Sequence, residues 1–90
     1  MNIKYSAKSV KDLKKFSHPD KTLVAKKIKY LADNFEELKK SKKVTDLKGS
    51  AFEGQFRFVI AKKIRVLFRV ENDEIILLVL RIGFRKDIYK

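Results

Sequence analysis

The sequence predicts an α+β domain of order βααβββ, in which two antiparallel N-terminal helices pack on one face of a small, mainly antiparallel, twisted sheet. Two observations carry this prediction. Apolar residues recur every three or four positions as far as Leu38, and after Gln55 they alternate with polar ones. The 90 residues contain no Pro-, Gly- or Ser-rich linker and no internal repeat, which indicates a single domain over residues 1–90.

A strand and a first helix are predicted at the N-terminus. Residues 2–5 form a short alternating segment, and Ser6 after it is a suitable N-cap. The apolar residues that follow at helical spacing are Val10, Leu13 and Phe16. We therefore expect these three side chains to form the buried stripe of the first helix.

A second helix is predicted after a break at residues 17–20. Pro19 suits the first turn of a helix. The apolar stripe that follows consists of Val24, Ile28, Leu31, Phe35 and Leu38. The pattern leaves two ends open for this helix, near Asn34 or at Leu38. Residues 39–50 are polar and basic, and we expect them to form a solvated connector.

Two alternating segments after the connector predict a hairpin. Phe56, Phe58 and Ile60 share one face of the first strand, and the second strand places on the same face Ile64, Val66, Phe68 and Val70. Side chains that pair across a hairpin must share a face. Ile60 can therefore match Ile64 only across a three-residue loop, residues 61–63.

This register also predicts where two arginines lie. Arg65 falls opposite Val59 and Arg57 falls opposite Leu67, so the arginines are diagonal neighbours, roughly 7–8 Å apart at the backbone. Both then point away from the face that the helices cover. A guanidinium group offers planar donors that suit phosphate, and several on one face favour an anion-binding site. The alternative is that Arg57, Arg65 and Arg69 are ordinary exposed strand residues, or that they pair with nearby glutamates.

The last strand is predicted from a continuous apolar run. Asn72 and Asp73 form a turn, and residues 75–80 are all apolar. Such a run predicts a strand buried on both faces in the centre of the sheet. The chain is expected to leave this strand through Gly83.

Charge and composition narrow the functional classes. The chain has 23 Lys and Arg against 11 Asp and Glu, a net charge of +12, which favours a nucleic acid or an acidic protein as partner, although a solubilising surface would also be basic. The absence of cysteine excludes disulfides and thiolate metal sites, and His18 is the single imidazole, so we expect no metal and no cofactor. The residues of a Ser-His-Asp triad, a Walker loop and a dinucleotide fingerprint are missing. No apolar run is long enough to cross a membrane, and we expect a cytoplasmic protein without a membrane partner.

Several motifs resemble the RelE/ParE toxin superfamily over nearly the whole chain. They are the early helix pair, Leu47-Lys48-Gly49 before the hairpin, the two hairpin strands, and the ending LRIGFRKDIY at residues 80–89. The resemblance implies the toxin of a type II toxin–antitoxin system, a metal-independent, ribosome-dependent endoribonuclease. In such an enzyme the 2′-hydroxyl of messenger RNA attacks the adjacent phosphate.

The resemblance also implies site residues. Arg57 matches a phosphate-contacting residue, Arg65 an arginine that stabilises the transition state, Arg85 a residue at the leaving side, and Tyr89 a stacking or proton-transfer residue. Further expected RNA contacts are Lys48, Arg69, Arg81, Phe84 and Lys86.

This chain departs from the family pattern at two positions. Val59 stands where RelE has a second lysine, and Phe84 stands where many relatives have histidine or lysine. Phe84 could stack on a nucleobase or pack against the sheet edge. Glu53 is the carboxylate closest to the site strand and could act as a base, although an ordinary glutamate on a surface loop is the better interpretation.

The implied partners are an acidic antitoxin, the ribosome and messenger RNA, with DNA contacted only by a toxin–antitoxin complex. Two alternative functions stay open. One is a ParE-like inhibitor of DNA gyrase, and the other is a relic that binds RNA or antitoxin without cutting.

Overall fold

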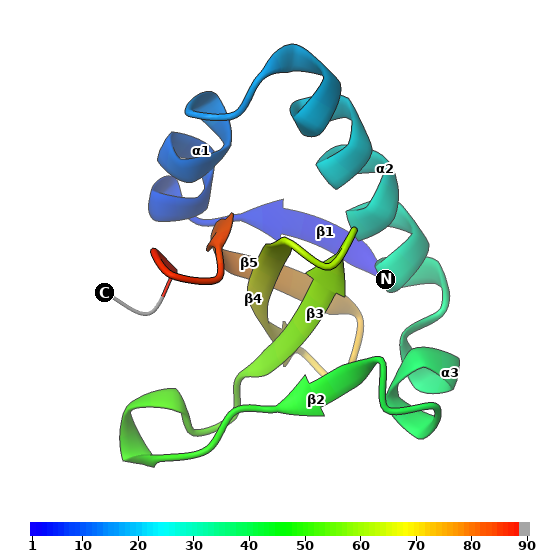
Figure 1. Cartoon of the computed structure of the whole chain (residues 1–90). Coiled ribbons are helices and arrows are strands. Elements are labelled where there is room, and N and C mark those ends of the chain that lie inside the picture. Colours follow the sequence, from blue (N-terminus) through cyan, green and yellow to red (C-terminus); the bar gives the residue numbers. More distant parts are fainter. Residues whose placement is uncertain (89–90) are drawn as a thin grey trace.

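The computed structural model describes residues 1–88 and arranges them as helices on a five-stranded sheet (Figure 1). The strands are β1 (Asn2–Tyr5), β2 (Val44–Asp46), β3 (Phe56–Ile60), β4 (Ile64–Glu71) and β5 (Ile76–Phe84). The helices are α1 (Ala7–Lys14), α2 (His18–Asp33) and α3 (Phe35–Lys40), and a 3-10 turn, η1, spans Ser50–Phe52. The predicted α+β class is therefore confirmed.

The order of the strands in the sheet is β1-β5-β4-β3-β2. Only β1 and β5 run parallel, which requires a crossover, and the chain between them supplies the helices and the other three strands. The central strand is β4 and not β5. On the side of β5 away from the core, Ile76, Leu78 and Leu80 are only half-buried, so the prediction of a central strand buried on both faces is wrong.

The hairpin register follows the prediction. Ile60 pairs with Ile64 across the loop at residues 61–63, Val59 pairs with Arg65, and Arg57 pairs with Leu67. The loop closes with positive φ at Ala61 (52°) and Lys62 (63°), a backbone conformation that L residues adopt rarely. Burial of the core side chains therefore determines this register, although the loop residues disfavour the backbone conformation that it requires.

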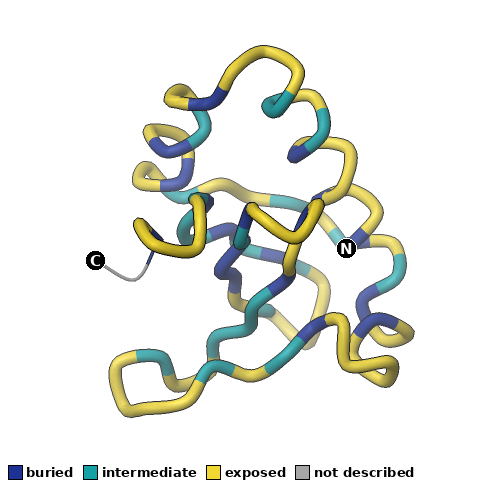
Figure 2. Tube along the Cα trace, in the orientation of Figure 1, coloured by how far each residue is buried: buried dark blue, intermediate teal, exposed yellow. Residues whose placement is uncertain are grey.

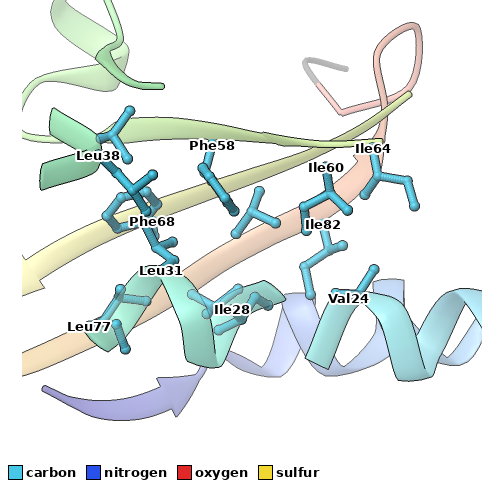
Figure 3. Packing of buried hydrophobic residues seen from close by; sticks show 14 of the residues in the cluster. Val24, Ile28, Leu31, Leu38, Phe58, Ile60, Ile64, Phe68, Leu77 and Ile82 are labelled. Carbon is cyan, nitrogen blue, oxygen red and sulfur yellow. The ribbon is translucent and has the colours of Figure 1, made fainter. Parts of the chain in front are cut away.

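The hydrophobic core lies between α2 and one face of the sheet (Figure 3). Helix α2 contributes Val24, Ile28 and Leu31, all with no exposed surface. At one end of the core the ring of Phe68 packs against two other rings, Phe56 at 5.5 Å and Phe35 at 6.0 Å between centroids. Sheet residues that complete the core are Phe58, Ile60, Ile64, Val66, Leu77, Val79 and Ile82.

Helix α1 does not use the predicted apolar stripe. Phe16, just after the helix, is buried and Leu13 is half-buried, but Val10 is 41% exposed. The buried positions within α1 are Ser9 and Asp12. Polar side chains are buried there because each finds a hydrogen-bond partner: the Ser9 hydroxyl donates to the carbonyl of Ser6, and Asp12 accepts from strand β5.

The segment expected to be a solvated connector holds two elements. Helix α2 ends at Asp33, and the separate short helix α3 then continues to Lys40. A helix therefore ends within a few residues of each of the two predicted ends, Asn34 and Leu38. Strand β2 then pairs antiparallel with β3 from Val44–Phe58 to Asp46–Phe56. The sheet thus gains a strand that the sequence pattern did not predict.

The end of β5 also differs from the prediction. Gly83 does not mark the exit from the strand, because β5 continues through Phe84 and Gly83 pairs with Arg65 of β4. None of the helices within residues 1–88 is long and apolar enough to span a lipid bilayer.

Truncating Phe68 to alanine tests the core. We expect Phe68→Ala to lower the free energy of unfolding by about 3–5 kcal/mol, since it leaves a cavity among packed rings. The matched control is Val10→Ala, which should change the stability by less than ~1 kcal/mol because Val10 is largely exposed and alanine favours helix. Urea unfolding of the three proteins measures both values, and a comparable loss in the two variants would contradict this core.

Candidate functional site

The sheet face that α2 does not cover carries the predicted arginine pair. We call it the open face and define it by Arg57, Val59, Arg65, Leu67 and Gly83. Since β3 and β4 alternate, burial of Phe58 and Val66 on the core side turns these five residues to the other side.

Arg57 and Arg65 are diagonal neighbours on the open face, as predicted. Arg57 pairs with Leu67 and Arg65 pairs with Val59, and both arginines are half-buried. The guanidinium of Arg65 is held at the hairpin end, where its Nη1 donates to the carbonyl oxygen of Lys62 at 3.2 Å. A bound phosphate would therefore meet one oriented guanidinium and a second close by.

The open face is covered in part by apolar side chains. Leu67 is only 2% exposed, although the sequence placed it among solvent-facing residues. It lines a hollow of about 440 Å³ together with Phe52 of η1, Leu80 of β5 and Ile88. Neither Arg57 nor Arg65 lines this hollow, but Leu67, the pairing partner of Arg57, does, so the open face has an apolar section. The tube coloured by burial shows the mixed pattern along these strands (Figure 2).

The C-terminal turn folds back onto β5 next to Arg65. The N–H of Ile88 donates to the carbonyl of Phe84 at 3.1 Å, and Ile88 is 3% exposed. A Cβ added to Gly83 would lie 3.5 Å from the Cβ of Ile88, so the glycine leaves room for this close approach. Gly83 is the pairing partner of Arg65, so Ile88 lies next to that position of β4, and Arg85 and Lys86 within the turn are exposed. Tyr89 lies outside the described residues.

Arg81 takes a structural position instead of an open one. Its Nε donates to Oδ2 of Asp12 at 2.8 Å and its Nη2 donates to Oδ1 at 3.2 Å, which forms a two-point ion pair. The backbone N–H of Ile82 donates to the same Oδ2 at 2.9 Å. Two of the five donors of Arg81 thus tie α1 to β5, and because this structural role accounts for its position we leave Arg81 out of the proposed RNA contacts.

Asp12 itself was missed by the sequence analysis. Burial alone would raise the pKa of its carboxyl, but the hydrogen bonds from Arg81 and Ile82 and the charge of Arg81 outweigh it, so the pKa lies below its ordinary value of 3.8. The same contact raises the pKa of Arg81. The signal in the sequence is the spacing of Ser9, Asp12 and Phe16, which share a helix face.

Phe84 packs against the first helix. Its ring lies 5.2 Å from that of Phe16, centroid to centroid, and it remains 37% exposed. Of the two roles that the sequence left open, packing at the sheet edge is the one observed, and the exposed part of the ring is still free to touch a ligand.

The remaining candidate residues are at the surface. Lys48 and Arg69 are exposed, as are Glu53 after η1 and His18 at the start of α2. Residues 1–88 contain no group of three or more His, Asp or Glu side chains placed to hold a metal ion.

Comparison with known proteins identifies the fold and the family to which these features correspond. Residues 3–89 match the family model described as the ParE toxin of the type II toxin–antitoxin system parDE. No curated protein sequence matches the chain.

Solved structures that share the fold include toxins, alone or in complexes with antitoxins. RelE of the archaeal RelE–RelB complex from Pyrococcus horikoshii is 18% identical with a TM-score of 0.68, and the match covers 96% of both chains. The isolated RelE toxin of E. coli is 12% identical with a TM-score of 0.69, over 92% of this chain and 82% of that chain. The YoeB/ParE toxin of Agrobacterium tumefaciens is 21% identical with a TM-score of 0.63, over 94% and 99% of the two chains.

The ion pair of Asp12 predicts a dependence of stability on pH. Asp12→Asn should lower the free energy of unfolding near neutral pH by about 1.5–3 kcal/mol, the range for a hydrogen bond to a charged partner. A carboxyl whose pKa is lowered in the folded state stabilises fully above its unfolded pKa, and this advantage is lost as the pH falls through the lower folded value. Urea unfolding at a series of pH values measures the difference between wild type and variant.

The control for this experiment is Asp33→Asn, at the exposed end of α2. It should change the stability by less than about 0.5 kcal/mol at neutral pH. A difference between wild type and Asp12→Asn that persists undiminished in strong acid would contradict the ion pair.

Proposed function

The chain belongs to the ParE toxin family of type II toxin–antitoxin systems, and from that premise we propose that it is a ribosome-dependent endoribonuclease that cuts messenger RNA in the cytoplasm. The observation that carries the proposal is the placement of Arg57 and Arg65 as diagonal neighbours on the open face, with the basic C-terminal turn folded back beside them. Preorganised cations at one phosphate are what this cleavage needs.

The proposed reaction is an internal transesterification. The 2′-oxygen of one nucleotide forms a bond to the adjacent phosphorus, and the bond from phosphorus to the 5′-oxygen of the next nucleotide breaks. The 2′-hydroxyl loses a proton and the departing 5′-oxygen gains one, so the products are a 2′,3′-cyclic phosphate and a 5′-hydroxyl. Negative charge grows on the phosphate oxygens in between, and Arg65, fixed by its bond to Lys62, is the group we assign to that charge.

The other proposed roles are those that the family resemblance implies. Arg57 holds the phosphate from the neighbouring strand, and Arg85 acts from the C-terminal turn at the leaving side. Tyr89, whose position the structure does not describe, is proposed as the stacking or proton-transfer residue. Backbone contacts with RNA are assigned to the exposed cations Lys48, Arg69 and Lys86.

An acidic antitoxin is the proposed protein partner. The net charge of +12 leaves a surface that an acidic segment would neutralise, and this would block access to the arginines. Contact with DNA is proposed only for the toxin–antitoxin complex.

A second candidate function is inhibition of DNA gyrase. It is supported by the family model, which is that of the ParE toxin, and by two apolar residues that depart from the family pattern. Val59 and Phe84 are each 37% exposed where a nuclease would gain from a charged or proton-transferring side chain. Val59 lies on the open face, whereas Phe84 pairs with Ile64 and packs against Phe16 on the other side of the sheet, so only Val59 offers an apolar contact to a protein bound at the open face.

Mapping of RNA ends tests the proposal. The chain is added to a translating extract and to the same extract with translation blocked, and primer extension locates the cuts. We expect cuts that depend on translation, reduced about 100-fold or more in Arg65→Ala, since removal of a donor that stabilises transition-state charge costs this much. Tyr89→Phe should lower cleavage as well.

The matched control is Lys26→Ala, which removes a cation from the exposed surface of α2 and should leave cleavage within about twofold of wild type. Intact RNA together with altered plasmid supercoiling would instead favour the gyrase inhibitor. Cleavage that is equal in wild type and Arg65→Ala would overturn the assigned role of Arg65.

A further inference from the structure

The apolar hollow on the open face has no part in the roles proposed so far. Its volume is about 440 Å³, within the range of about 300–1,000 Å³ that holds small molecules in proteins. The first turn of α1, the segment around η1, strands β4 and β5 and the C-terminal turn form its walls. The apolar residues that line it are Ala7, Phe52, Leu67, Leu80 and Ile88.

The apolar hollow continues the line of the arginine pair along the sheet. Leu67 lies two residues after Arg65 on β4, and Gln55 lies two residues before Arg57 of β3. Because β3 and β4 run antiparallel, both steps lead in the same direction, and each spans about 7 Å. A phosphate held by the two arginines would therefore lie next to this hollow.

The walls of the apolar hollow suit a flat ring. Leu67 and Ile88 are almost completely buried, at 2% and 3% exposed, and the ring of Phe52 is half-buried. A nucleobase stacks on an aromatic side chain through its π-face, which every base has, so the ring supplies affinity without selecting a base.

Gln55 is the polar group with which the hollow can recognise the edge of a base. Its backbone N–H donates to the carbonyl of Phe52, and its carbonyl accepts from the N–H of Leu47. Its half-buried side-chain amide has no hydrogen-bond partner in the part of the chain that the structure describes. An amide offers both donors and an acceptor, a combination that can form two hydrogen bonds with one base edge.

The charge beside the hollow favours a nucleic acid strand over an apolar protein side chain. Lys8 is an exposed cation, and Arg81 also lines the hollow, although two of its donors are held by Asp12. None of the described residues that line the hollow is a carboxylate. A protein side chain would fill the apolar part but would leave Lys8 and the Gln55 amide without a partner, whereas a nucleotide brings a phosphate and a polar base edge.

We propose that the apolar hollow binds the base of the nucleotide beside the phosphate held by Arg57 and Arg65, stacked on Phe52 and recognised at its edge by Gln55. Gln55 is then a specificity-determining residue, and the ring of Phe52 positions the base for it. This inference rests on the proposed function in one respect, the identity of the bound strand as messenger RNA.

The test is an NMR titration of the full chain with 2′-deoxy trinucleotides, which lack the attacking 2′-hydroxyl and cannot be cut. Replacement of each base in turn by an abasic sugar should weaken binding by about tenfold or more at one position and by less than about threefold at the other two. The methyl signals of Leu67, Leu80 and Ile88 should shift with the complete strand and lose most of this shift with the strand that is abasic at the sensitive position.

Variants of Phe52 test the stacking. Phe52→Leu should weaken binding of the complete strand by about fivefold or more but change binding of the abasic strand by less than about twofold. Phe52→Tyr keeps the ring and should stay within about twofold of wild type. The matched control, Tyr30→Leu, removes an exposed ring of α2 that does not line this hollow, and it should change binding by less than about twofold. Thermal unfolding confirms that each variant is folded.

Variants of Gln55 test the recognition of the base edge. With each of the four bases at the sensitive position, we expect wild type to separate the strongest from the weakest by about fivefold or more, and Gln55→Leu to reduce this range to about twofold. Gln55→Glu can only accept hydrogen bonds, so it should favour adenine and cytosine, which carry an amino group, over uracil. Ratios of affinity within one variant remove the effect of its added charge.

Several results would contradict the inference. They are equal affinity for complete and abasic strands at every position, no methyl shift at millimolar strand, a loss in Phe52→Leu that is the same for both strands, and a base preference that Gln55→Leu leaves unchanged. A trileucine peptide that shifts the same methyl signals at lower concentration than any strand would assign the hollow to a protein and overturn the proposal.

The titration needs neither a ribosome nor cleavage, and it therefore separates this inference from the proposed function. Base-dependent binding by a chain that cuts no RNA would contradict the proposed function alone. Translation-dependent cuts by a chain whose binding ignores the base would contradict this inference alone.

Discussion

The pairing of β3 with β4 is the constraint on which the other features depend. Ile60 meets Ile64 across a three-residue loop, and from there every second residue of both strands enters the core under α2. A slip of one residue would put Phe58 and Val66 on different faces of the sheet and expose the apolar side chains of one of the two strands. Burial of the neighbouring side chains therefore positions the arginines of the open face. The backbone strain at Ala61 and Lys62 persists because this register buries the core side chains.

A second interaction, the contact of Asp12 with Arg81 and Ile82, gives one of the predicted site arginines a structural role. Parallel pairing of β1 with β5 ends at Val79, and beyond it α1 runs beside the edge of β5. Asp12 satisfies the N–H of Ile82 at this edge and holds Arg81 in the same contact, so the carboxylate takes the place of a neighbouring strand. Arg81 is thereby held in the contact between α1 and β5, whereas Arg57 and Arg65 lie away from this edge. One buried carboxylate thus separates a structural arginine from the candidate functional ones.

The sequence was sufficient where the pattern was strict. Alternation over residues 55–70 allowed one register, and the faces of Arg57 and Arg65 followed from it. Prediction from the sequence failed where polar residues are buried or where helices and strands are very short. Val10 fitted a helical stripe, but α1 is rotated so that Ser9 and Asp12 are inside, which hydrophobicity alone does not reveal because their hydrogen bonds compensate burial. The partner of Arg81 is 69 residues away, and β2 has three residues, of which only Val44 is buried. Neither a contact between residues so far apart nor a strand of three residues leaves a periodic signal in the sequence.

The most direct test of this account is the register of the hairpin in solution, measured on the unaltered chain by nuclear Overhauser contacts between Hα protons. Pairs that do not share hydrogen bonds bring their Cα atoms within about 4.5 Å and give strong contacts of this kind. The account predicts them between Val59 and Arg65 and between Arg57 and Leu67. Contacts displaced by one residue, such as Val59 with Val66, would place Arg57 and Arg65 on different faces of the sheet and contradict the account.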